Sequence, residues 1–73
     1  MTASELTALI LARLIRHEGG SRQAWRRRLG EMRVYSPATH PHCNWDFADS
    51  ASSGSIEAVL DWARGAHPRI LSD

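Results

Sequence analysis

The stretch that decides the fold is Thr2–Gly20, which reads TASELTALILARLIRHEGG in a chain of 73 residues. The Thr2 side chain can accept a hydrogen bond from the backbone of Glu5, and the Glu5 side chain can accept one from the backbone of Thr2. This reciprocal pair is typical of a helix start. Two glycines, Gly19 and Gly20, can end the helix. The sequence therefore predicts a helix between Thr2 and Gly19.

Apolar side chains cover about half of this helix's circumference, at roughly 100° per residue. They are Leu6, Ile10, Leu11, Leu14 and Ile15, with Leu9 beyond them. His17 falls within the same stripe, near the end of the helix. One packing face in so small a domain needs less apolar surface than this. We therefore expect the helix either to be central or to be covered in part by another molecule.

Two further helices are predicted from capping residues. Ser21 can begin a second helix from Arg22 to about Leu29, which Gly30 ends. Ser55 can begin a third, from Ile56 to about Ala66, before a His-Pro pair that disfavours continuation. Each of these helices has an apolar stripe that includes a tryptophan or lies beside one.

Alternating apolar and polar residues at Met32–Tyr35 and Asn44–Ala48 predict two strands. Ser36–Cys43 contains two prolines and predicts a long, stiff hairpin loop. Asp49–Ser55 predicts a flexible loop, and Arg69–Leu71 could add a third short strand. The predicted fold class is α+β: three helices packed on a small two- or three-stranded antiparallel sheet, in the order α-α-β-β-α, with an optional final β.

The length predicts a single small domain, residues 1–73, of marginal stability. The lone Cys43 excludes an internal disulfide and favours a reducing compartment. The apolar run Leu6–Ile15 is too short to span a bilayer, and Arg13 interrupts it. Only Glu5 is charged before this run, which makes it a poor signal peptide. We therefore expect a cytoplasmic protein that does not enter membranes.

Charge is divided unevenly between the two halves of the chain. Residues 1–34 carry a net charge of +4 and residues 35–73 a net charge of −3. All nine basic residues are arginines, a bias typical of bacterial genomes rich in G and C. Four arginines fall in the second predicted helix, and they could bind nucleic acid through phosphate contacts. They are Arg22, Arg26, Arg27 and Arg28. The preferred interpretation of the cluster is nevertheless a solvated helix face that makes ion pairs.

The segment Thr39–Phe47, THPHCNWDF, gathers the other chemically versatile side chains. Zinc could be bound by His40, His42 and Cys43, with a fourth ligand from elsewhere. A histidine could instead activate Cys43 as a nucleophile. In extended chain, however, His40 and His42 lie on one side and Cys43 faces the core. A recognition surface formed by His40, His42 and Asn44 is therefore the preferred interpretation.

Together these features predict a non-catalytic bacterial interaction or regulatory module rather than an enzyme, with no cofactor. We expect it to bind itself, as a homodimer, or another protein. The marginal size and the broad apolar stripe of the first helix motivate the homodimer. Nucleic-acid binding through the arginine cluster is the alternative function. A metal or thiol site at His40, His42 and Cys43 is the third.

Overall fold

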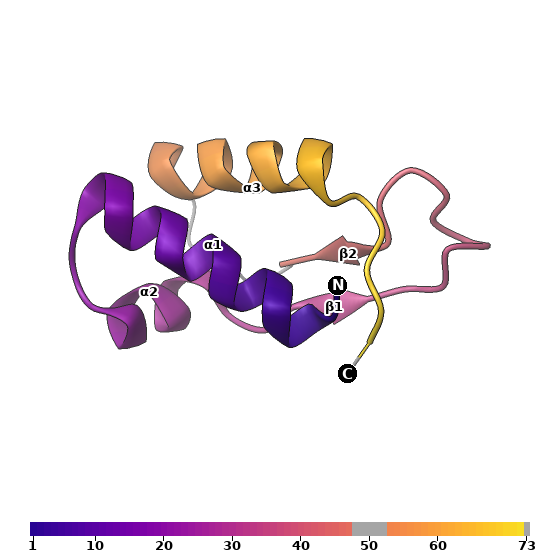
Figure 1. The fold of residues 1–73 in the computed structure, drawn as a ribbon, viewed down its shortest axis with the longest axis horizontal. Coiled ribbons are helices and arrows are strands. Elements are labelled where there is room, and N and C mark those ends of the chain that lie inside the picture. The colour runs from indigo at the N-terminus through magenta and orange to yellow at the C-terminus, as the bar shows by residue number, and fades with distance from the viewer. Residues whose placement is uncertain (48–52, 73) are drawn as a thin grey trace.

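The computed structural model describes residues 1–47 and 53–72 of the chain. These residues form three helices and two strands in the order α1 (Ala3–Glu18), α2 (Arg22–Leu29), β1 (Arg33–Val34), β2 (Trp45–Asp46) and α3 (Gly54–Ala66). The strands pair antiparallel, with Val34 opposite Trp45 (Figure 1). The predicted α+β fold class and order of elements are confirmed.

Helix α1 is the centre of the fold. The predicted capping box is present: the Glu5 backbone N–H donates to Thr2 Oγ1 at 3.2 Å, and the Thr2 N–H donates to Glu5 Oε1 at 3.1 Å. Both α2 and α3 pack against α1 (Figure 1). Four of its apolar side chains are fully buried, namely Leu6, Ile10, Leu11 and Leu14. The breadth of the apolar stripe is thus explained within one molecule, by two packing partners on different sides.

Two side chains at the edges of the α1 stripe, Leu9 and Ile15, are only half-buried. His17 is exposed, so it is not packed within the stripe, but its predicted position near the end of the helix is confirmed. It lies in the last turn of α1, which borders a surface hollow between α1 and α3 instead of the core.

Glycines set the turns at both ends of α2. Gly19 and Gly20 have φ angles of 76° and 88°, and Gly30 has a φ of 75°. Residues other than glycine rarely adopt positive φ angles of this size. The tight first turn lets the Trp25 indole N–H donate to the carbonyl oxygen of Gly19 at 2.7 Å. Trp25 is therefore tied to the end of α1 as well as packed against the core.

Helix α3 begins two residues earlier than the sequence predicts. Ser53 is the N-cap, and its Oγ accepts a hydrogen bond from the backbone N–H of Ile56 at 3.2 Å. Ser55, the predicted cap, lies inside the first turn and donates to Glu18 Oε1 at 2.5 Å. The predicted start of α3 is wrong by two residues because several neighbouring serines can cap a helix equally well. Most of the predicted flexible loop, and the predicted end of the second strand at Ala48, lie outside the described residues.

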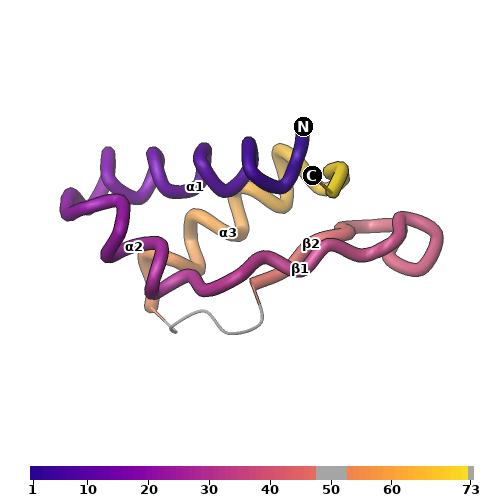
Figure 2. Tube along the Cα trace, turned by 90° about the horizontal axis from the view of Figure 1, so that it is seen from below, coloured from indigo at the N-terminus to yellow at the C-terminus, as the bar shows by residue number. Residues whose placement is uncertain are grey.

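The C-terminal segment does not extend the hairpin as a third antiparallel strand. Leu71 instead forms an isolated parallel bridge with Thr2. The segment still contacts the hairpin, because the backbone N–H of Asn44 donates to the carbonyl oxygen of Pro68 at 3.0 Å. It therefore ties the hairpin to the start of α1. Figure 2 shows the hairpin loop projecting beyond the helices.

The core lies where the helices meet the inner side of the hairpin. Trp25, Trp45 and Phe47 are buried in it together with aliphatic side chains from all three helices. Trp62 is only half-buried, and the Arg13 guanidinium lies 3.8 Å from its ring centroid. In the part of the chain that the structure describes, no helix is both long enough and apolar enough to cross a bilayer.

Candidate functional site

The structure does not bring His40, His42 and Cys43 together as ligands of one metal ion. The ring of His40 stacks on Tyr35, with centroids 4.2 Å apart, and its Nδ1 is 2.9 Å from Thr39 Oγ1. His42 is exposed at the projecting loop. Within residues 1–47 and 53–72, no three histidine, cysteine or acidic side chains are grouped as metal ligands. The described residues therefore do not assemble the zinc site considered from the sequence.

Cys43 is half-buried against the core, on the side that strand alternation predicts. Its Sγ donates a hydrogen bond to the carbonyl oxygen of Trp45, at 3.4 Å. His40 and Cys43 do line one shallow surface hollow, together with Asp46 and Arg64. Arg64 is engaged there, since it pairs with Asp46 at 3.2 Å. The geometry gives Cys43 a structural hydrogen bond to the backbone instead of a hydrogen-bonded histidine base.

Asn44 does not belong to the predicted recognition surface, because its side chain is only 1% exposed. Its Nδ2 donates to the carbonyl oxygens of Tyr35, at 3.1 Å, and Ile70, at 2.8 Å. Its Oδ1 accepts from the backbone N–H of Ile70, at 2.9 Å. One amide thus joins the hairpin to the C-terminal segment. A partner can reach the exposed His42 but not this amide.

The arginines of α2 carry positive charge that forms no ion pair with the described residues. All four predicted residues are exposed: Arg22, Arg26, Arg27 and Arg28. The Arg28 guanidinium lies 4.6 Å from the centroid of the Trp25 ring. The side chains of the other three make no ion pair or hydrogen bond with any residue in the described part of the chain, whereas Arg64 pairs with both Asp46 and Asp61. The interpretation preferred from the sequence, a solvated helix face making ion pairs, therefore holds for the exposure of the arginines but not for the ion pairs.

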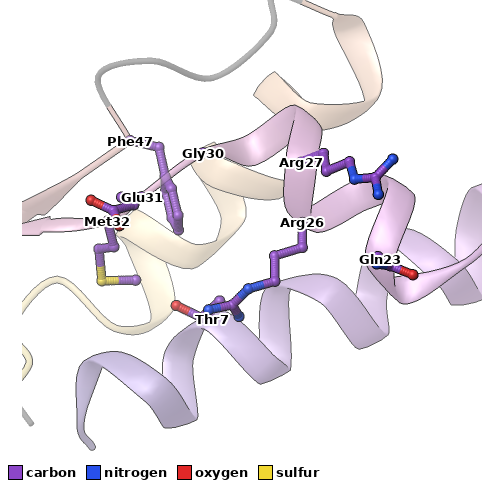
Figure 3. Close-up of a pocket in the computed structure, with 8 residues that line it drawn as sticks. All are labelled: Thr7, Gln23, Arg26, Arg27, Gly30, Glu31, Met32 and Phe47. Carbon is purple, nitrogen blue, oxygen red and sulfur yellow. The ribbon is translucent and has the colours of Figure 1, made fainter.

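An open groove of about 700 Å³ runs beside α2 (Figure 3). Its walls come from α1, α2 and the chain that leads into β1 and out of β2. They are formed by Thr7, Gln23, Arg26, Arg27, Gly30, Glu31, Met32 and Phe47. In Figure 3 the Arg26 side chain reaches from α2 toward Thr7 on α1, whereas Arg27 points away from it. Glu31 and Met32 lie at the other end of the groove.

Sequence reasoning found the arginines but missed Gln23, Glu31 and Met32. No motif links these residues, because the groove forms only when α1 and the start of β1 pack on either side of α2. The sequence did mark Glu31 as unusual, since it is the single acidic residue between Ser21 and Tyr35.

Comparisons with protein-family models, with curated proteins and with solved structures find no match to this chain. The candidate function therefore depends on the chemistry of the surface itself.

Proposed function

We propose that this chain is a non-catalytic nucleic-acid-binding module that contacts phosphates through α2. The observation that carries the proposal is the set of exposed α2 arginines without ion-pair partners among the described residues. Arginine suits this role, because its planar guanidinium can donate two parallel hydrogen bonds to one phosphate.

The placement of the arginines around α2 favours contact with an extended polyanion. Trp25 and Leu29 mark the buried face of the helix. At about 100° per residue, Arg27 lies on the opposite side, and Arg26 and Arg28 lie on the two flanks. A surface of this kind can meet phosphates at several points along a strand. A single small anion would engage only one of them.

A purely local role explains the cluster only in part. Arg26, Arg27 and Arg28 occupy the last turn of α2, where positive charge stabilises the helix dipole. That effect contributes about 0.3–1 kcal/mol per residue at an exposed site and is screened by salt. It does not account for Arg22 at the first position of the helix, where a positive charge is unfavourable. An anionic partner accounts for all four.

The proposal is tested by fluorescence anisotropy with a labelled oligonucleotide over a series of salt concentrations. We expect the logarithm of the association constant to fall with the logarithm of salt concentration, with a slope of about −2 to −3. Arg27→Gln should weaken binding about 3- to 10-fold and reduce the slope by about one unit. Arg27 is the best choice, because its exposed side chain makes no ion pair, hydrogen bond or ring contact with the described residues.

Arg69→Gln is the matched control, since it removes the same charge at a distance from α2. Arg69 is exposed and donates to the carbonyl oxygen of Pro41 in the hairpin loop, at 3.0 Å. Its loss should leave both the affinity and the salt slope close to those of the unmodified protein. If the two substitutions weakened binding equally, binding would depend on the net charge of the protein and not on α2, which would contradict the proposal. Binding of polyglutamate in place of nucleic acid at low salt would assign α2 to an acidic protein partner instead.

A further inference from the structure

We infer that the groove beside α2 holds one unpaired nucleotide of a single-stranded nucleic acid, with its phosphate at Arg26 and its base at Glu31 and Met32. This inference rests on the proposed function and adds the class of nucleic acid and a base preference. The groove residues that carry it are Arg26, Glu31, Met32 and Phe47.

One end of the groove suits a phosphate. The Arg26 side chain enters the groove from α2 and reaches toward α1 (Figure 3). Gln23 also lines the groove, but in Figure 3 its amide points away from the Arg26 guanidinium. The guanidinium alone can donate two parallel hydrogen bonds to phosphate oxygens. Gly30 also lines the groove and adds no side chain that would fill it.

The other end suits a base. Met32 is half-buried and packs against the core, and Phe47, which is 4% exposed, also lines the groove. A thioether beside an aromatic ring offers an apolar, polarisable wall for a flat ring. Glu31 is exposed at this end, and no described residue pairs with it. The groove thus has a cationic end and an acidic end, which matches a nucleotide with its phosphate at one end and an amino-bearing base at the other.

The Glu31 carboxylate gives the groove a preference among bases. A carboxylate accepts hydrogen bonds only, so it favours the bases that carry an exocyclic amino group, namely cytosine, adenine and guanine. Thymine and uracil present carbonyl oxygens at the equivalent positions and would be repelled. In a duplex one N–H of this amino group is bonded to the opposite base, and stacking on the neighbouring bases keeps the whole base out of the groove. A single strand leaves the edge of the base free, as sequence-specific recognition of unpaired bases requires.

The test compares three labelled probes of about ten nucleotides by fluorescence anisotropy: oligo(dC), oligo(dT) and a mixed-sequence duplex. We expect oligo(dC) to bind about 5- to 10-fold more tightly than oligo(dT), and more tightly than the duplex. Glu31→Gln should bring the two single strands to within about twofold of each other, because a glutamine amide can both donate and accept. Met32→Ala should weaken both single strands by a similar factor. Thermal melting of each variant separates loss of binding from loss of folding.

The outcomes separate this inference from the proposed function. Equal binding of oligo(dC) and oligo(dT), or an unchanged preference in Glu31→Gln, would overturn the inference. Duplex binding as tight as oligo(dC) binding would overturn the inference too. If Arg27→Gln still weakened binding in that case, the proposed function would stand. Cytidine monophosphate binding as tightly as oligo(dC) would point to a free nucleotide and also overturn it. Failure of every probe at low salt would remove both.

Discussion

At the scale of single residues, Asn44 is the side chain on which the arrangement of the C-terminal segment depends. Its amide makes three hydrogen bonds to backbone groups of Tyr35 and Ile70, and it is 1% exposed. Asn44→Ala would leave a buried N–H and two carbonyl oxygens without this partner. We expect a loss of about 2–4 kcal/mol in the free energy of unfolding. A domain of this size has about 4–11 kcal/mol in total, so urea unfolding would detect the change easily.

His42→Ala is the control for this prediction, because His42 lies two residues away in the exposed loop. Its unfolding midpoint should remain within the equivalent of about 0.5 kcal/mol of that of the unmodified protein. Addition of a chelator should shift neither midpoint, since the described residues group no metal ligands around His42. If Asn44→Ala and His42→Ala unfold at the same midpoint, the structural role assigned to Asn44 is wrong.

His42 and Asn44 also show how much of the candidate site can be predicted from the sequence. Both were predicted to lie on one recognition surface, because alternate residues of an extended chain share one side. Their separation depends on the C-terminal segment, 26 residues away, which covers Asn44. A single sequence carries no signal for such a distant partner. The α2 arginines were predictable because exposed charge on a short helix needs only local information.

At the scale of elements, the turn between α1 and α2 requires glycine. Gly20 has a φ of +88°, and a Cβ added there would lie 3.2 Å from Nε1 of Trp25. Gly20→Ala should therefore cost about 1–2 kcal/mol in the free energy of unfolding and disturb the environment of the Trp25 indole. Tryptophan fluorescence during urea unfolding reports both effects.

Gly65→Ala is the same chemical change, but we expect it to raise the free energy of unfolding. Gly65 lies in α3 without a positive φ, and an added Cβ there would meet nothing within 4 Å. Alanine should stabilise the protein by up to about 0.5–1 kcal/mol, because it restricts the unfolded chain and favours the helix. Changes of the same sign in the two variants would show that backbone conformation does not govern these positions.

The elements themselves were largely predictable, and the exceptions have physical causes. Local capping fixed the start of α1 at Thr2 and the span of α2, because the capping groups lie within three residues of one another. The start of α3 was misplaced by two residues, because Ser53 and Ser55 can both cap and Glu18 on another helix engages Ser55. The predicted third strand pairs with Thr2 instead of the hairpin. Pairing between chain ends leaves no pattern in either segment.

At the scale of the whole molecule, the structure removes the main argument for a homodimer. Uncovered apolar surface on α1 would favour a dimer, but α2 and α3 cover most of this surface from different sides. Among the described residues, the large apolar side chains that remain exposed are Met1, at 43%, and Leu71, at 67%. They lie beside the Thr2–Leu71 bridge, where the two chain ends meet. Two side chains form a small patch, whereas stable interfaces bury about 800 Å² per partner.

We therefore expect the protein to be monomeric, with a melting temperature that does not change over about a hundredfold range of concentration. A dimer dissociates as it unfolds, so its melting temperature would rise with concentration. Circular dichroism and sedimentation velocity measure the two properties independently. Leu71→Ser is the informative variant, because it removes the larger exposed apolar group. If the melting temperature rises with concentration and Leu71→Ser abolishes the rise, the homodimer predicted from the sequence exists, and its interface lies at the chain ends instead of along α1.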